Sequence, residues 1–218
     1  MLHPAAALRL VNETIGMGVF ATAFIPKGTI IWVLDELDII LSPREVGALP
    51  ALLRPIVETW SYVDGDGRYV FCWDHGRYMN HSCEPSSRGI GECIEIAVRD
   101  IHPGEQLTCE YGTLRLSRPL ECACGAAACR GQVTPADVAA CWSAWDAEAS
   151  EAAQLASSLP QPLIPFARRG NPEQAILDAI SGGRPLPPLP SSRAFQSLRP
   201  SGPVPAGAAL WALSEVSA

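Results

Sequence analysis

The first half of the chain alternates short apolar runs with glycine and proline breaks. Residues 8–11 lead into a glycine turn at residues 16–18, and residues 29–34 follow a break at Pro26-Lys27-Gly28. The runs are rich in β-branched and aromatic side chains and are too short for typical helices. This pattern predicts a mainly β domain of many short strands over about the first 115 residues.

Two further stretches strengthen the β prediction. Residues 62–63 and 69–73 flank Asp64-Gly65-Asp66-Gly67, which predicts a hairpin. Residues 93–98 alternate apolar and polar positions, as a half-buried strand does. Helix is expected in only one place within this part, where Ser42, Pro43 and Glu45 have the order of N-cap, N1 and N3 residues.

The last third of the chain has a different pattern. Thr134, Pro135 and Asp137 predict a helix N-terminus, and the alanine-rich stretch 138–157 should continue as a helix. A short helix is expected at 171–180, before Gly182-Gly183. Prolines recur from residue 159 and are densest at 185–190, so this segment is expected to be extended and to bury little surface.

Composition narrows the class of protein. The 16 basic and 23 acidic residues give a net charge of −7, which argues against direct binding of nucleic acid and suits a basic protein partner. The sequence has no apolar run of the ~20 residues that cross a bilayer, so no membrane association is expected. No secretory signal is evident, which predicts a cytoplasmic protein. Lys27 is the only lysine, and this composition favours a bacterial source.

Cysteine spacing indicates a metal site. Three of the eight cysteines, Cys122, Cys124 and Cys129, have the spacing Cys-x-Cys-x4-Cys. Without a secretory signal, such a cluster is better interpreted as a metal site than as disulfides. Three thiolates are one short of the tetrahedral set that structural zinc requires.

Four motifs in a fixed order carry a family resemblance. They are Gly16-Met17-Gly18, the run from Arg77 to Cys83 (Arg-Tyr-Met-Asn-His-Ser-Cys), the run 104–112 that ends in Glu-Tyr-Gly, and the cysteine spacing just described. Their order and spacing resemble the SET-domain protein lysine methyltransferases with a post-SET zinc segment. The resemblance covers residues 8–134. It implies a fold of several small, mostly antiparallel sheets with a knot-like substructure around Asn80 and Tyr111.

The resemblance also implies a cofactor site for S-adenosylmethionine. The turn Gly16-Met17-Gly18 would contact the cofactor with its backbone, and Asn80 and His81 would hold it through side chain and backbone. The remaining residues expected at this site are Tyr62, Arg77 and Tyr78. The segment between Trp73-Asp74 and Asn80 is about half the length usual in the family.

Two tyrosines are expected to act on the acceptor lysine. Tyr111 corresponds to the catalytic tyrosine of the family, and Tyr62 lies where the family has a second active-site tyrosine, although Tyr69 stays open for that second role. Cys109 stands where many family members have a bulkier aromatic residue. Its smaller side chain leaves more room beside the amine, which favours adding more than one methyl group. In the family the fourth zinc ligand is the cysteine of Asn-His-Ser-Cys, here Cys83.

The predicted organisation is a SET domain at 8–116, a post-SET zinc segment at 117–134, a helix at 135–158 and a Pro-rich extension at 159–218. The expected activity is methylation of lysine side chains on a protein, plausible acceptors being histones or other basic proteins. Two alternatives are a non-catalytic SET-like binding module and a zinc-stabilised scaffold that acts through its Pro-rich extension. Binding of S-adenosylmethionine would separate the enzyme from the scaffold.

Overall fold

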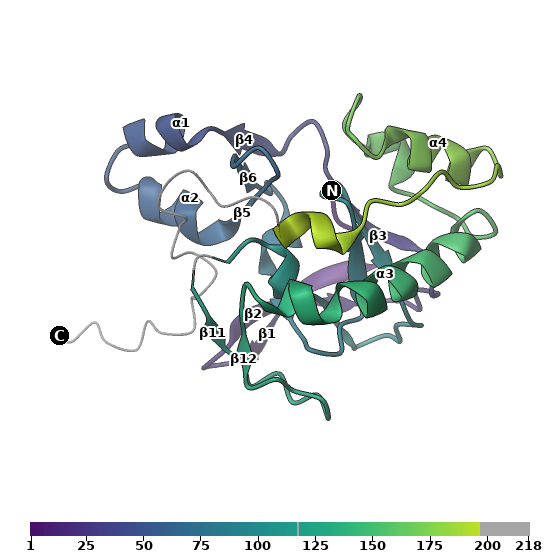
Figure 1. Cartoon of the computed structure of the whole chain (residues 1–218). Helices are drawn as coiled ribbons and strands as arrows, with labels where there is room; N and C mark the ends of the chain where they lie inside the picture. The colour runs from purple at the N-terminus through teal and green to yellow at the C-terminus, as the bar shows by residue number, and fades with distance from the viewer. Residues whose placement is uncertain (117, 197–218) are drawn as a thin grey trace.

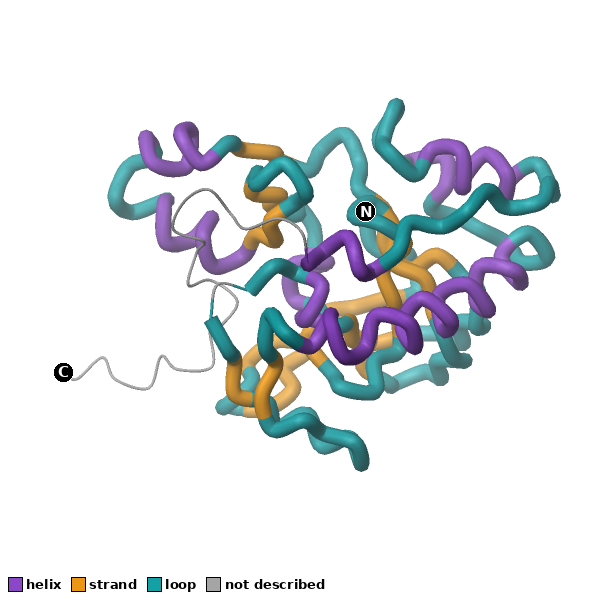
Figure 2. Tube along the Cα trace, in the orientation of Figure 1, coloured by secondary structure: helices purple, strands orange, loops and turns teal. Residues whose placement is uncertain are grey.

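A computed structural model describes residues 1–116 and 118–196, and in it the strands form four small sheets (Figures 1 and 2). The largest sheet has the order β1-β2-β10-β7, with strands Ala6–Asn12, Gly16–Ala21, Gln106–Cys109 and Asn80–His81. A second has the order β3-β9-β8, with strands Ile30–Val33, Ile94–Ala97 and Ser87–Ile90. The third, β4-β6-β5, comprises Ile39–Leu41, Tyr69–Phe71 and Ser61–Val63, and the fourth pairs β11 (Leu120–Glu121) with β12 (Gln132–Val133).

The predicted mainly β architecture is confirmed for the SET-like part of the chain. Every strand pair is antiparallel except β7 with β10, where Thr108 lies opposite Asn80 and Cys109 opposite His81. This parallel pairing brings the Asn80 segment beside the segment that leads to Tyr111. The hairpin of β5 and β6 forms as expected around the turn at residues 64–67.

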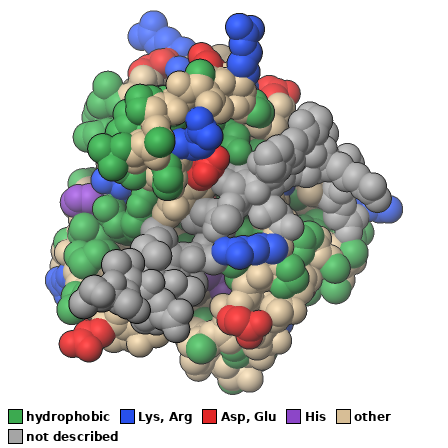
Figure 3. Space-filling view, turned by 90° about the vertical axis from the view of Figure 1, so that its left-hand side faces the viewer, with side chains coloured by type: hydrophobic (Ala, Val, Ile, Leu, Met, Phe, Trp, Pro, Cys, Tyr) green, Lys and Arg blue, Asp and Glu red, His purple; other side chains and the backbone are tan. Residues whose placement is uncertain are grey.

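Helices lie at the edges of this β structure (Figure 1). The longest, α3, covers one side of the sheets, and α1 and α2 form a separate lobe with β4, β5 and β6. Hydrophobic side chains gather on the face of this lobe that Figure 3 shows. The α-helices are α1 (Pro43–Ala48), α2 (Arg54–Trp60), α3 (Asp137–Ala156) and α4 (Gln174–Ser181). The 3-10 helices are His75–Tyr78, Tyr111–Thr113, Ile164–Phe166 and Ser192–Gln196.

The start of α1 follows local capping chemistry. Ser42 caps α1 through a capping box, in which its hydroxyl accepts from Glu45 N and the Glu45 carboxylate accepts from Ser42 N. Thr134 and Asp137 make related hydrogen bonds just before α3, although not a capping box: Thr134 N donates to the Asp137 carboxylate at 3.0 Å, and Ala136 N donates to Thr134 Oγ1. The regular helix begins at Asp137, because residues 134–136 form only a turn.

The segment 159–196, named here the C-terminal strap, corrects the expectation for the Pro-rich extension. Leu163, Leu177 and Ile180 of the strap are buried in one cluster with residues of β3, β8, β9 and α3. Gln161 bonds the backbone of the neighbouring strand, accepting from Ile30 N at 2.8 Å and donating to Gly28 O at 2.9 Å. Enough apolar side chains lie between the prolines to bury a real interface. The rest of the predicted extension, 197–218, lies outside the described residues.

Candidate active site and cysteine cluster

Asn80 and the glycine turn meet across two strands of the largest sheet. The Asn80 amide Nδ2 donates to Met17 O at 3.1 Å. A Cβ atom at Gly18 would lie 2.9 Å from this amide and 2.7 Å from the Gln106 side chain. Gly18 is therefore needed because no other residue leaves room for Asn80 to reach the turn.

A cavity of about 430 Å³ opens beside this junction. Its walls include most of the residues expected at the cofactor and catalytic sites: Gly16, Met17, Tyr62, Arg77, Tyr78, Asn80 and Tyr111. Gly18 and His81 are not among the lining residues. The volume is within the usual range of small-molecule sites.

His81 occupies a different place from the one expected. Its ring lies 3.4 Å from Cys83 Sγ through Nε2 and accepts from Tyr111 N at Nδ1 (3.2 Å). Neighbouring residues of a strand point to opposite faces, so Asn80 turns to the cavity and His81 to the cysteines. Burial, reinforced by the charge of Arg130, lowers the pKa of His81 to about 4, and the ring is neutral at pH 7. Its side chain supports the Tyr111 backbone and does not line the cavity.

The two candidate tyrosines line the cavity with neutral hydroxyl groups. Tyr111 Oη donates to Met79 O at 2.8 Å, and Tyr62 Oη donates to Glu92 O at 2.9 Å. Burial raises the pKa of both phenols, so neither forms a phenolate near pH 7. Tyr69 lies on β6 and is not among the lining residues, whereas Tyr62, Tyr78 and Tyr111 are.

Other lining residues come from segments that the motifs do not include. Glu92 and Glu95 contribute acidic side chains, Arg115 pairs with Glu92, and Phe195 arrives from the C-terminal strap. The Arg115 guanidinium lies 4.8 Å from the centre of the Phe195 ring. Of these four residues, only Glu95 has a signal in the sequence. The alternation of apolar and polar positions in residues 93–97 places Glu95 on the face opposite Ile94 and Ile96.

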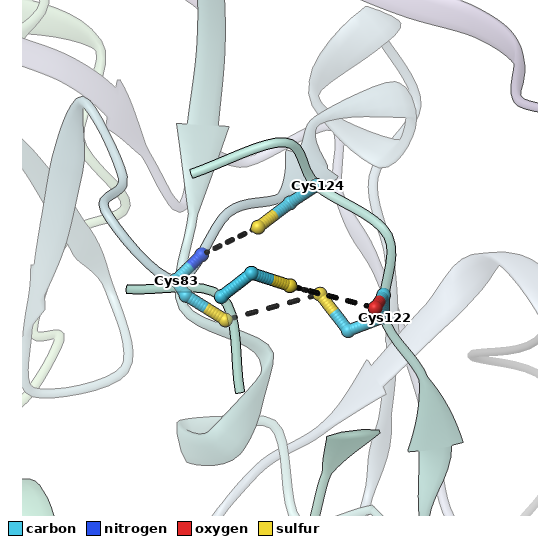
Figure 4. A group of neighbouring side chains, drawn as sticks. Cys83, Cys122 and Cys124 are labelled. Atoms are coloured by element: carbon cyan, nitrogen blue, oxygen red, sulfur yellow. Dashed lines mark hydrogen bonds between the residues drawn. The ribbon is translucent and has the colours of Figure 1, made fainter. Parts of the chain in front are cut away.

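The cysteine cluster, defined by Cys83, Cys122, Cys124 and Cys129, assembles as predicted from two distant segments (Figure 4). The four sulfur atoms lie within 4.8 Å of one another, with Cys83–Cys122 at 3.8 Å and Cys122–Cys129 at 3.7 Å. A tetrahedral zinc site with Zn–S of about 2.3 Å separates its sulfurs by roughly 3.8 Å. Burial would raise the pKa of Cys124, yet backbone N–H groups of Cys83 and Ala126 lower it to about 6. The donor set fits a structural zinc ion.

Arg130, next to the last cysteine, connects the cluster to the Tyr111 segment. Its Nη2 donates to both oxygens of the buried Glu110 carboxylate at 2.7 and 2.9 Å, and its backbone N donates to Cys83 Sγ. A second partner, Asp137 at the start of α3, lies 3.1 Å away. Arg88 approaches the other side of Glu110 at 3.4 Å. The cysteine motif did not reveal this network, because a guanidinium in a polar loop has no sequence pattern.

Comparison with known proteins finds a family model that matches the central segment of the chain. Residues 16–112 match the SET domain family model. Three histone-lysine N-methyltransferases align with part of the chain: ASHH2 of Arabidopsis thaliana (37% identity over 67 residues, 27% of this chain), TRX1 of Oryza sativa subsp. japonica (36% over 88 residues, 32%) and Set2 of Drosophila melanogaster (37% over 65 residues, 26%). The aligned parts span only 4%, 9% and 3% of those relatives. The similarity to SET domains therefore covers the central segment of the chain, residues 16–112.

Two solved structures resemble part of the molecule at 19% identity. One is a Plasmodium falciparum protein described as a histone methyltransferase, with a TM-score of 0.38 over 50% of this chain and 95% of that one. The other is KRYPTONITE in complex with mCHG DNA and SAH, with a TM-score of 0.42 over 56% of this chain and 28% of that one. No helix within residues 1–116 and 118–196 is long and apolar enough to cross a membrane.

Proposed function

We propose that this chain is an S-adenosylmethionine-dependent methyltransferase that acts on lysine side chains of a basic protein. The observation that carries the proposal is the meeting of three motifs in one cavity: the turn Gly16-Met17, the Asn80 side chain and the Tyr111 hydroxyl. Histone-lysine methyltransferase relatives of the matching segment support the same reaction.

The cavity fits the cofactor at the glycine turn. Gly16 has φ +76° and open space above its Cα, so the backbone there can approach a ligand closely. Trp60 and Tyr78 add an aromatic wall, with ring centres 4.6 Å apart. When bound, S-adenosylmethionine supplies a methyl group on a positively charged sulfur atom. The residues expected to hold it are Gly16, Met17, Tyr78 and Asn80.

The tyrosines would orient the acceptor amine. Because the Tyr111 hydroxyl donates its proton to Met79 O, its oxygen lone pairs are free to accept from an amine N–H. Holding the amine in line with the methyl group is the main contribution expected of such a channel. Cys109, a buried thiol whose pKa is raised by burial, lines the same cavity and leaves space for a methylated nitrogen. We therefore expect di- or trimethyl-lysine among the products.

The cysteine cluster would bind one structural zinc ion through four thiolates. Zinc at this place would fix Cys83, which follows the Asn80-His81 strand, to the segment 122–129. Arg130 would then hold Glu110, the residue just before Tyr111, in place. The proposed zinc ion would therefore be structural. It would stabilise the Tyr111 segment, which forms part of the cavity wall.

Transfer of labelled methyl groups tests the enzyme proposal. The full chain is incubated with labelled S-adenosylmethionine and either core histones or a bacterial lysate, and the labelled lysines are identified by mass spectrometry. Tyr111→Phe should fold, bind cofactor and lose most transfer, with a stability loss of about 1 kcal/mol from the missing hydrogen bond. Tyr69→Phe is the matched control, and it should keep wild-type transfer. Absence of transfer to any protein by the wild type, with cofactor bound, would favour a non-catalytic module.

A further inference from the structure

Among the described residues that line the cavity, Glu95 is the acidic residue that forms no ion pair, whereas Glu92 is paired with Arg115. Glu95 projects from β9 toward the cavity, and its Oε2 accepts from Ser87 Oγ at 2.7 Å. The other oxygen, Oε1, lies 3.4 Å from the place where a Cβ atom at Gly89 would be. Gly89 lies directly opposite Glu95 in the β8–β9 pair, so the absence of a side chain there leaves the carboxylate room.

The charged groups around Glu95 are already engaged elsewhere. Arg88, on β8, donates through Nε to Glu148 at 2.7 Å and lies 3.4 Å from Glu110. Glu110, at the end of β10, repels a charge on Glu95, and Cys109 beside it is a neutral thiol. Desolvation outweighs the Ser87 hydrogen bond and the Arg88 charge and raises the pKa of Glu95 to about 7.

Cys109 and Tyr111 line the same cavity as Glu95. We propose that the Glu95 carboxylate is the group that receives the acceptor ammonium in this cavity and takes its proton, so that Glu95 serves as the general base of the methyl transfer. This inference rests on the proposed function and deepens it, because it selects a cationic primary amine as the acceptor.

The proposed step conserves atoms, protons and electrons. The ammonium gives one proton to the Glu95 carboxylate, which leaves a neutral amine and a carboxylic acid. The amine nitrogen forms a bond to the methyl carbon while the carbon–sulfur bond breaks, and the bonding electrons leave with sulfur, which becomes a neutral thioether. The methylated nitrogen carries the positive charge away, and Glu95 returns its proton to solvent through the cavity mouth.

A carboxyl group with these surroundings matches the demands on a base. A base acts best when its pKa is near the working pH, and an unperturbed carboxylate is too weak to deprotonate an ammonium efficiently. The cavity also depresses the pKa of a bound ammonium by desolvation, which brings the two groups closer in proton affinity. Ser87 fixes the orientation of the carboxylate by holding one oxygen and leaves the other open to the amine.

Glu95→Gln tests the proposal with two readouts. The glutamine keeps an oxygen for Ser87, so the fold is expected to be retained. In infrared spectra of the protein alone, the wild type should show a protonated-carboxyl C=O band that disappears as pH rises through about 7, and Glu95→Gln should lack it. In methyl transfer to core histones, the variant should be roughly 100-fold slower at pH 7, within the range that a general base contributes. Its rate should also keep rising with pH where the wild-type rate has levelled off.

Glu148→Gln is the matched control, because it removes a carboxylate from Arg88 outside the cavity. It should keep the wild-type pH profile. If Glu95→Gln transferred methyl groups at a rate within two-fold of the wild-type rate, with an unchanged pH profile, the role of Glu95 would be overturned. The proposed function would still stand. Absence of transfer by the wild type would contradict the proposed function and this inference together.

Discussion

The cysteine segment at 118–134 and the C-terminal strap at 159–196 both attach the chain that follows the SET-like part to it, and they differ in how much apolar surface they bury. The cysteine segment buries few large apolar residues and is held by four sulfur atoms and the Arg130–Glu110 ion pair. The strap is held by an apolar cluster that includes Leu163 and Leu177, together with hydrogen bonds such as those of Gln161 to Gly28 and Ile30. Attachment by polar ligands leaves a motif in the sequence, and attachment by burial leaves only a weak amphipathic pattern.

The strand β9 contributes to both the apolar cluster and the cavity. Ile94 and Ile96 belong to the apolar cluster with α3 and the strap, and Glu95 lines the cavity together with Ile94. The backbone N of Glu92, at the cavity rim, donates to Glu173 of the strap at 3.2 Å. The strap therefore contacts the rim of the cavity as well as the core.

Removal of the strap should have the largest effect on the molecule. A chain that stops at Ser158 exposes the apolar surface of β3, β9 and α3, so we expect loss of the cooperative melting transition in calorimetry. The milder Leu177→Ala should cost about 3 kcal/mol, as a fully buried leucine does. Leu52→Ala, at a side chain that is 79% exposed, is the control and should change stability by under about 0.5 kcal/mol. A truncated chain that melts like the full one would remove the strap from the core.

Loss of one thiolate should affect the cysteine segment and leave the strap intact. Metal analysis of the wild type should give about one zinc ion per chain, and Cys124→Ser should lose it. Limited proteolysis should then cut within 118–134 while the strap stays protected. Cys141→Ser, outside the cluster, should retain the zinc. Full zinc content in Cys124→Ser would contradict the four-thiolate site.

Arg130→Ala tests whether charge fastens the cysteine segment to the Tyr111 segment. It leaves the buried Glu110 carboxylate with weaker pairing, so we expect a stability loss of about 3 kcal/mol by denaturant unfolding. The double variant Arg130→Met/Glu110→Gln should be less destabilised than Arg130→Ala, because no uncompensated charge remains. Equal losses in the two would mean that the Arg130 side chain contributes by packing.

The pH dependence of stability tests Glu95 independently of the cysteine segment and the C-terminal strap. The folded-state pKa of Glu95 is about 7, above its ordinary value of 4.5. The protonated carboxyl therefore contributes stability that is full below pH 4.5 and is lost as pH rises through 7. Relative to Glu95→Gln, the wild type should lose about 3 kcal/mol between pH 4.5 and pH 8, measured by denaturant unfolding at each pH. Parallel curves for the two proteins would show that Glu95 has an ordinary pKa.

Local sequence signals predicted many of the strands, the start of α1 and the residue types of the sites, but they missed α2. Short β-branched runs between glycine and proline breaks gave the strands, and Ser42 with Glu45 gave the start of α1, because both signals act within a few residues. The spacing Cys-x-Cys-x4-Cys indicated three metal ligands for the same reason. The family resemblance added Cys83, Asn80 and Tyr111, which lie far apart along the chain.

The way in which these elements and residues come together depends on contacts between distant segments. The turning of His81 toward the cysteines depends on the parallel pairing of β7 with β10, a contact between residues about 30 positions apart. The burial of Leu177 and the position of Phe195 at the cavity depend on contacts over still longer separations, and the Arg130–Glu110 pair joins residues 20 positions apart. The alternation of apolar and polar positions along β9 would by itself place Glu95 on an exposed face. Glu95 becomes a candidate base because β8, β10 and the cavity walls surround that face. Desolvation and pairing arise from neighbours in space, and for these residues the neighbours come from distant parts of the chain.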